Sequence, residues 1–374
     1  MKKHLLAIAA LAAVSGSVAA QNVTMYGVID NAFQTQSKSA AADTTGPNVG
    51  SKTTMQRGGL WAPVWGFTGS EDLGGGLKAS FDLQGYVDTD TGVGNQFGGV
   101  FGRASWVALS SSAGTLKLGK QLDPAVLAFA STDPRGLKET QSGLITWYTG
   151  ADSRQSASAG DGTAGNHASV NHNQVANIFI ANAVTYSQSI NGFNIGLGYS
   201  FGEKAGDNTA NSVKTVGLSY SAAGFTVSGS YSKNEGADTA NTGKSQSERS
   251  SFGLAYQVMP NVKVKANYMK AELNNSSAVK SVENEVYGYG VEYNWSPKNL
   301  LTVAYYDGEN KLASGDTSKS LIVSNEYSLS KRTVLYALAS SHKGGANFTS
   351  AASMGTTVKN ERTTVTQLGI AHRF

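Results

Sequence analysis

The sequence predicts an all-β protein, a closed antiparallel 16-stranded transmembrane β-barrel with long loops at one end and short turns at the other. Apolar and polar residues alternate with a period of two over many segments, and no stretch shows a comparable helical period. Tight turns alternate with long polar connections along the chain. The chain also opens with a secretory segment and contains no cysteine.

The strand pattern is clearest in GFNIGLGYSFG, where Phe193, Ile195, Leu197 and Tyr199 share one parity and small or polar residues share the other. Alternate side chains of a strand point to opposite faces, so this segment has one apolar and one polar face. The same alternation recurs in 225–231, 252–258, 262–268, 287–295, 299–308 and 332–341.

The connections give the strand number. Seven short connections carry the Gly, Pro, Asn and Ser residues that tight turns require: 70–76, 110–114, 189–193, 221–225, 258–262, 296–300 and 328–332. Eight long polar connections lie near 36–57, 89–98, 121–174, 203–212, 232–248, 272–284, 308–318 and 342–360. Fifteen connections join sixteen strands.

Three features favour a membrane barrel over a soluble sandwich. The strands exceed the usual length of about 5–6 residues. Their polar face is rich in Gly, Ser, Thr, Lys and Glu, which suits a water-filled lumen. Aromatic residues such as Tyr199, Phe225, Tyr293 and Trp295 lie near the ends of apolar faces, as in an aromatic girdle. Closure also removes the free edges that lipid cannot satisfy.

The N-terminal segment has the order of a signal peptide, with Lys2 and Lys3, an apolar run and then small residues. We therefore expect a signal peptide over 1–20 and a single barrel domain over 21–374. The absence of cysteine excludes disulfides, thiol catalysis and zinc–thiolate sites. Thirty basic against 26 acidic residues, with no basic block, give no indication of nucleic-acid binding.

Several blocks resemble the general porins of Gram-negative bacteria, in particular the β-proteobacterial type: NVTMYGVIDNAF, WGFTGSEDLGGGLKASFDLQG, FGRASWVALSSSAGTLKLGKQLDP, LSKRTVLYALAS and LGIAHRF. The resemblance implies a homotrimer in the cell outer membrane, surrounded by lipid. It also implies passive diffusion of small hydrophilic solutes and ions, with the third long loop folded into the lumen.

The chain departs from this family at two places. Val64 and Thr68 occupy positions of the second strand where the family has basic residues, and no basic residue lies between Arg154 and Gly192. The basic ladder that lines the constriction is therefore thinned. We expect an open, weakly ion-selective pore, while the preferred solute stays undetermined.

Charge placement, and not a reacting group, determines function in a pore. The family motif FGR assigns Arg103 to the constriction, although simple alternation places it on the lipid side, so a rim or interface role stays open. Alternation directs Lys263 and Lys265 to the lumen. The predicted basic pore-lining residues are Lys78, Arg103, Lys117 and Lys120.

Acidic residues of the third long loop are candidates for the opposite side of the constriction. If they face the basic wall, a transverse field results, although simple solvation of each acid is the plainer alternative. The predicted constriction-loop acids are Asp123, Asp133 and Glu139.

Two other classes of function are less well supported. His167 and His172 lie five residues apart in the third loop, with no thiolate or acid pair to complete a metal or catalytic site. We therefore expect no enzyme activity, no metal and no cofactor. A plugged adhesin barrel is disfavoured by the Gly and Ser residues on the lumen faces.

The chain ends on TQLGIAHRF, in which Leu368, Ile370 and Phe374 share one parity. We expect this segment to be the closing strand, paired with the first strand near Met25. In barrels that resemble this one, a terminal aromatic residue is the signal read by the outer-membrane insertion machinery. Phe374 is therefore the predicted assembly signal.

Overall fold

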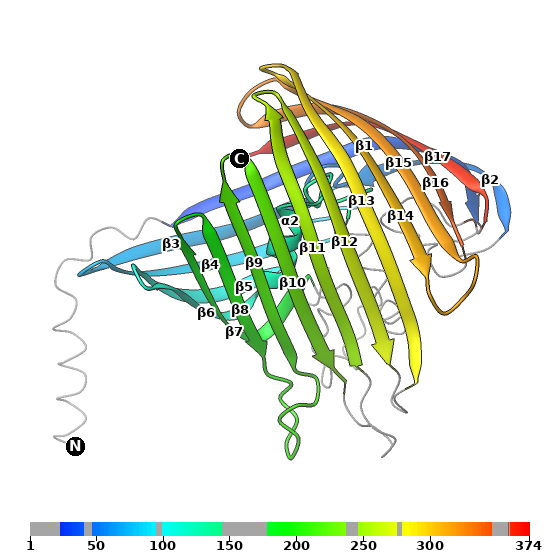
Figure 1. Cartoon of the computed structure of the whole chain (residues 1–374). Helices are drawn as coiled ribbons and strands as arrows, with labels where there is room; N and C mark the ends of the chain where they lie inside the picture. Colours follow the sequence, from blue (N-terminus) through cyan, green and yellow to red (C-terminus); the bar gives the residue numbers. More distant parts are fainter. Residues whose placement is uncertain are drawn as a thin grey trace, which may run out of the picture.

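The computed structural model describes residues 23–40, 47–94, 99–143, 178–236, 246–274, 279–345, 358 and 360–374. Strands dominate, and their arrangement around one inner helix is visible in Figure 1. The elements are β1 (Thr24–Ala40), β2 (Asn48–Arg57), β3 (Val64–Gly74), β4 (Leu77–Tyr86), β5 (Ala104–Ser111), β6 (Gly114–Leu122), α2 (Pro124–Ala130), β7 (Phe179–Ile190), β8 (Phe193–Ser200), β9 (Val213–Ala222), β10 (Phe225–Glu235), β11 (Gln246–Met259), β12 (Val262–Asn274), β13 (Lys280–Ser296), β14 (Asn299–Asn310), β15 (Thr317–Ser328), β16 (Thr333–Gly344) and β17 (Arg362–Arg373).

The seventeen strands of the described chain form a closed sixteen-position barrel. β2 and β3 are two pieces of one barrel strand, because β1 pairs with β2 over 31–40 and with β3 over 24–28. β1 also pairs with β17, from Val28 opposite Arg373 to Gln36 opposite Val365, which closes the barrel. The predicted fold class and strand number are confirmed.

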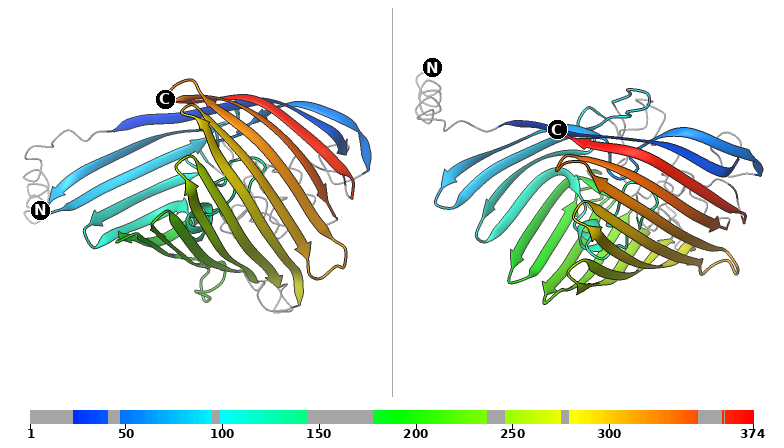
Figure 2. Two further views of the ribbon diagram at one scale, coloured as in Figure 1. Left: turned by 45° about the horizontal axis from the view of Figure 1, so that its top comes forward. Right: turned by 90° about the horizontal axis from the view of Figure 1, so that it is seen from above.

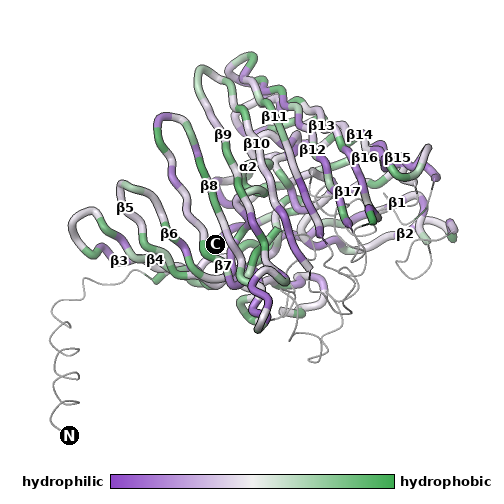
Figure 3. Tube along the Cα trace, turned by 60° about the horizontal axis from the view of Figure 1, so that its bottom comes forward, coloured by the Kyte–Doolittle hydropathy of each residue, from purple (hydrophilic) through white to green (hydrophobic). Residues whose placement is uncertain are grey.

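Burial alternates along many of the strands, most regularly in β10–β12 and β14–β17. In β15, Ile322 is fully buried, whereas its neighbours Leu321 and Val323 expose 46% and 40% of their surface. The exposed apolar residues face outward and the buried or polar ones face the lumen, as a barrel with a lipid-facing exterior requires. Figure 3 displays this alternation of apolar and polar residues along the Cα trace.

All seven predicted tight turns join consecutive antiparallel strands, from β3–β4 to β15–β16. The predicted long loop over 36–57 is wrong in extent, because β1 continues to Ala40 and β2 covers Asn48–Arg57. Its residues are mostly Ser, Thr, Lys and Gln, so neither face of these strands shows an apolar alternation. Loops near 272–284 and 308–318 are shortened for the same reason, since polar strand ends extend into them.

Apolar packing inside the barrel lies between the third long loop and the inner wall. Ala125, Val126 and Phe129 of α2 cluster with Met269 of β12. A second cluster covers the inner wall of β13–β16, with Val286, Ala304, Tyr306, Ile322 and Leu338. The two views in Figure 2 show α2 within the curve of the strands. The loop therefore provides apolar packing inside the barrel, which in a soluble β-protein comes from two facing sheets.

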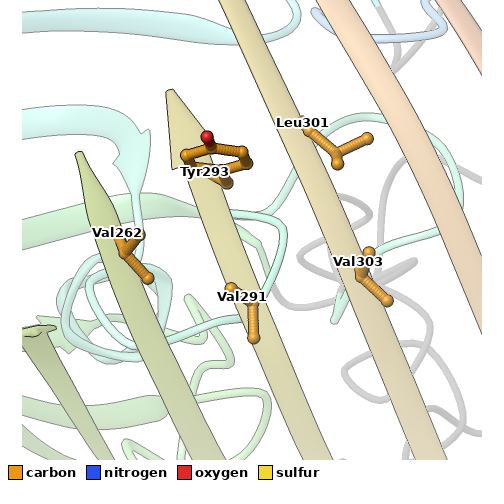
Figure 4. Close-up of a pocket in the computed structure, with 5 residues that line it drawn as sticks. All are labelled: Val262, Val291, Tyr293, Leu301 and Val303. Atoms are coloured by element: carbon orange, nitrogen blue, oxygen red, sulfur yellow. The ribbon is translucent and has the colours of Figure 1, made fainter. Parts of the chain in front are cut away.

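The outer wall is apolar and carries a shallow depression. Val262 of β12, Val291 and Tyr293 of β13, and Leu301 and Val303 of β14 line an apolar depression of about 280 Å³ (Figure 4). All five residues have the outward parity of their strands, so the depression belongs to the lipid-facing surface. Among the described residues, no helix has the length and apolar character needed to cross a bilayer.

Candidate functional site

The third long loop enters the lumen directly after β6, where Asp123 caps α2. The Asp123 carboxylate accepts hydrogen bonds from Ala125 N (2.8 Å) and Ser232 Oγ (3.0 Å), and also from the hydroxyl of Thr215. Pro124 at the first position of the helix suits this geometry, since proline lacks the amide that would go unpaired there. One side chain therefore starts the helix and fastens it to β9 and β10.

Glycines on the inner wall form a seat for this loop. A Cβ at Gly217 would lie 2.1 Å from Pro124 O, and one at Gly253 would lie 1.9 Å from Thr132 Oγ1. At Gly290 a Cβ would lie 2.6 Å from Pro134 Cβ. These glycines, with Gly196 and Gly288, are called the glycine seats below. They let the loop backbone lie directly on the wall, which no larger residue would permit.

Beyond α2 the loop turns around Asp133. Its carboxylate accepts from Arg135 N (3.0 Å), Leu137 N (2.9 Å) and the Tyr306 hydroxyl of β14 (3.0 Å). Lys138 then forms an ion pair with Glu326 of β15. The loop is thus attached to successive strands from β8 to β15, and it covers this half of the inner wall.

The segment between β2 and β3 also bends into the lumen. Asp30 of β1 is fully buried and accepts from Leu60 N (2.8 Å), Trp61 N (2.7 Å) and the Tyr336 hydroxyl (2.6 Å). The loop reaches this segment through Glu139 N, which donates to Leu60 O (3.1 Å). The segment between β2 and β3 therefore holds the end of the third loop that is farthest from α2. We call this segment the far anchor below.

Glu139 faces a basic wall from this anchor. The Tyr86 hydroxyl of β4 donates to Glu139 Oε1 (3.4 Å), and Arg57 lies behind it, 5.4 Å from the Tyr86 ring centroid. Burial raises the pKa of Glu139, and the charges of Arg103 and Arg57 oppose that rise. One loop carboxylate therefore lies within electrostatic reach of two arginines on the wall.

The two arginines differ in their partners. Arg57 Nη1 forms an ion pair with Asp88 Oδ2 (2.7 Å). Arg103 directly precedes β5, and its guanidinium lies 4.8 Å from the Phe179 ring centroid. Its position outside the strand frees it from the alternation that would turn it toward lipid. The side chain acts electrostatically on Glu139 and on Tyr26 of the inner wall.

The predicted basic residues of the strands separate in the structure. Lys117 lies on the inner side of β6, opposite Ala108, with its ammonium 4.1 Å from the Trp106 ring centroid. Lys78 is exposed at the turn end of β4, opposite Asp72 and away from the loop anchors. Lys120 lies opposite Ser105, on the outward parity of β5. Lys120 also lies where the register of β6 against β7 shifts, and its role in lining the pore stays a prediction.

The predicted loop acids also separate. Asp123 and Asp133 are fully buried in anchoring hydrogen bonds, whereas Glu139 is only partly buried. The prediction that Asp123 and Asp133 face the opening is therefore wrong, because each carboxylate points into the loop–wall contact. The metal and catalytic candidates His167 and His172 lie outside the described residues.

Sequence reasoning missed several polar residues of the inner wall. Tyr26 donates to Asp82 Oδ1 (2.6 Å) and accepts from Gln84 Nε2 (2.8 Å), which forms a polar patch across β1 and β4. The loop predicted over 36–57 includes Arg57, and the sequence gives no sign of its ion pair with Asp88. Parity places Asp82 and Gln84 on the lumen face, but it cannot predict their contact with Tyr26, which lies two strands away.

The chain terminus is built into the barrel seam. Phe374 N donates to Gly27 O (3.1 Å), and Gly27 N donates to Phe374 O (3.1 Å). A Cβ on Gly27 would lie 2.2 Å from Phe374 Cζ, so the ring covers the glycine. Next to it, the Arg373 guanidinium lies 3.7 Å from the Trp61 ring centroid. The closing strand therefore pairs with β1 to its last residue.

A closed antiparallel barrel with an inner loop and an apolar exterior is the architecture of an outer-membrane β-barrel. Residues 7–347 match the Gram-negative porin family. The chain therefore belongs to this family, and it is an outer-membrane protein.

Similar proteins support this membership. Outer membrane porin protein 32 of Delftia acidovorans is 32% identical over 259 residues, which cover 68% of this chain and 62% of the relative. An outer membrane porin protein of Bordetella pertussis is 34% identical over 227 residues, which cover 58% of this chain and 52% of the relative. The matches therefore span less than two thirds of each relative's length.

The fold is also similar to solved structures. An anion-selective porin from Comamonas acidovorans superposes with a TM-score of 0.77 at 22% identity, covering 95% of this chain and 100% of that one. A trimer form of OmpT from Vibrio cholerae superposes with a TM-score of 0.63 at 13% identity, covering 95% and 100%. At these identities the likeness concerns the fold.

Proposed function

We propose that this chain forms a water-filled channel for passive diffusion of small hydrophilic solutes and ions across the outer membrane. The observation that carries the proposal is the inner loop, which is fastened along the barrel wall and sets Glu139 against Arg57 and Arg103. A charged opening of this kind orients dipolar solutes and filters by size without binding them tightly. Channel function of the related porins supports the same reading.

The channel is weakly ion-selective, with a bias toward anions. Val64 and Thr68 supply no basic charge on β3, which limits the bias. Asp123 and Asp133 are buried and act little on passing ions, while Arg103 and Lys117 have no ion pair among the described residues. Arg57 and Lys265 are each paired with a carboxylate, at 2.7 Å in both cases.

Reconstitution tests both statements. Liposomes that contain the protein should swell in sugars at rates that fall with solute size. A plugged adhesin barrel would show no size-dependent permeation, which would refute the proposal. In planar bilayers under a KCl gradient, the reversal potential should show a small anion preference; strong selectivity of either sign would refute the weak bias.

Three partners complete the proposal. The chain assembles as a homotrimer, the closed cyclic form expected for such barrels, and its apolar exterior contacts outer-membrane lipid. The insertion machinery recognises the strand that ends in Phe374. Chemical catalysis and cofactor binding have no part in this function. Cross-linking in native membranes tests the homotrimer. Cross-linked samples that contain monomers and no trimer band would contradict it.

A further inference from the structure

A set of buried polar atoms without partners lies between the loop and the wall of β14–β17. Of the eight such side-chain atoms in the described part of the chain, six belong to this region. They are Arg135 Nε and Nη2, Gln141 Nε2, Thr302 Oγ1, His342 Nδ1 and Gln367 Oε1. Buried polar groups are almost always satisfied, so a cluster of exceptions indicates a bound water or ion.

Arg135 is the centre of this cluster. Its side chain is fully buried, and Nη1 donates to Ser324 Oγ (2.7 Å) on β15. The remaining Nε and Nη2 form the edge with which a guanidinium binds an anion bidentately. Thr302 is the register partner of Ser324, so its unpaired hydroxyl lies beside this edge of the wall.

The other unpaired atoms come from the end of the loop and from β16. His342 Nε2 is 3.2 Å from Gln141 Oε1, which leaves Gln141 Nε2 and His342 Nδ1 unpaired. The positive charge of Arg135 acts on His342, so the two side chains lie within electrostatic reach of each other. With His342 neutral and Nε2 facing Gln141 Oε1, His342 Nδ1 and Gln367 Oε1 can only accept, whereas Arg135 Nε, Arg135 Nη2 and Gln141 Nε2 can only donate.

The nearby acids do not neutralise Arg135. Asp133 is occupied by two backbone amides and the Tyr306 hydroxyl, and Glu326 is paired with Lys138. The described residues thus give the guanidinium no ion pair, although both acids act on it at longer range. Burying a cation that has no direct ion pair is unfavourable, and a neutral water compensates this less than an anion does.

We propose that a small inorganic anion of the chloride type binds between the loop and the wall, against Arg135 Nε and Nη2. The anion satisfies the guanidinium and joins the loop to β14–β16 in the region opposite α2. It is a structural site behind the loop, separate from the opening at Glu139, and it goes beyond the proposed channel function.

Bromide provides the first test, because it replaces chloride and scatters anomalously. Crystals of the wild-type protein grown in NaBr should show an anomalous peak within hydrogen-bonding distance of Arg135 Nε and Nη2. Arg135→Gln should lose the peak, whereas Arg57→Gln should keep it. Only water at this place in the wild type would overturn the proposal.

Stability in solution provides the second test. At equal ionic strength, wild-type protein should unfold at a higher temperature in NaCl than in sodium gluconate, with a difference that grows with chloride concentration. Arg135→Gln should remove this difference and Arg57→Gln should retain it. Equal midpoints of the wild type in both salts would overturn the proposal. If Arg135→Gln fails to assemble, Arg135→Lys takes its place and should show a weakened chloride dependence.

Discussion

At the scale of single residues, three acids of one loop have different roles because their surroundings differ. The carboxylates of Asp123 and Asp133 accept the hydrogen bonds that fasten the loop to the wall. Burial raises the pKa of Asp123 to about 6. Glu139 keeps partial access to solvent and faces Arg57 and Arg103. Of these three acids only Glu139 is not fully buried, so it is the one that we expect to act on a passing ion.

Glu139→Gln should increase the preference for anions, because it removes the carboxylate opposite two arginines. We expect the anion-to-cation permeability ratio to rise by a factor on the order of 2, as one charge changes the local potential by about kT. Reversal potentials in a KCl gradient measure this ratio. Glu309→Gln, on the outer side of β14, is the matched control and should leave the ratio unchanged. An unchanged ratio for Glu139→Gln would remove this residue from the opening.

Selectivity of the wild-type channel should also depend on pH. Burial raises the pKa of Glu139 above the ordinary value of 4.5, so its carboxylate takes up a proton at a higher pH than a solvated glutamate does. As pH falls through that raised pKa, the opening loses negative charge and the anion preference grows. Reversal potentials at successive pH values test this. Glu139→Gln should flatten the profile, and a profile equal to that of the wild type would contradict the assignment.

At the scale of elements, the loop path is determined by what the wall strands lack. The glycine seats on β8, β9, β11 and β13 allow the loop backbone to approach the sheet, and the break between β2 and β3 supplies the far anchor. The loop and the wall are therefore complementary surfaces, and the channel opening is the space that remains beside the loop.

Gly253→Val should displace the loop and reduce single-channel conductance. The added Cβ would lie 1.9 Å from Thr132 Oγ1, so the loop must move by roughly 2 Å to reach ordinary contact distance. Gly229→Val is the control, because a Cβ there lies 3.8 Å from its nearest neighbour, Ser251 O. Single-channel recording compares the two variants, and equal conductance would show that the loop does not rest on Gly253.

The sequence predicted the strands and turns well because a period of two is a local signal. Phe193, Ile195 and Leu197 alternate regardless of their neighbours in space. The site was predicted less well, because the roles of Asp123 and Asp133 depend on contacts far along the chain. Asp123 meets Thr215 and Ser232 only when the barrel closes. The Gly and Ser residues of the lumen faces predict a water-filled lumen, whereas several of these glycines are seats for the loop.

At the scale of the whole molecule, closure depends on one seam between β1 and β17. The seam ends with two hydrogen bonds between Gly27 and Phe374, and the Phe374 ring covers the glycine. Every other pair in the barrel joins strands that follow one another along the chain or, for β1 and β3, lie one strand apart, but this pair brings together the first and the last strand. The last residue is thus part of the step that completes the barrel.

Deletion of Phe374 should impair assembly more than permeation. The deletion removes two hydrogen bonds and the ring from the seam, while the loop and its anchors stay intact. The yield of heat-modifiable trimer in outer-membrane fractions should fall several-fold, and the conductance of the channels that do form should equal that of the wild type. Phe374→Tyr keeps an aromatic ring and should assemble well. Normal trimer yield after the deletion would refute the role of Phe374.

The glycine seats have a consequence for how such a channel can be adjusted. Because the loop rests on backbone, each side-chain atom added to a seat would push the loop toward the centre by a step of atomic size. The sieving limit could then be changed in graded increments from the wall, with no alteration of the loop's own sequence or of the charges it carries. A series of variants at the glycine seats would then give channels with different size-exclusion limits in the same barrel.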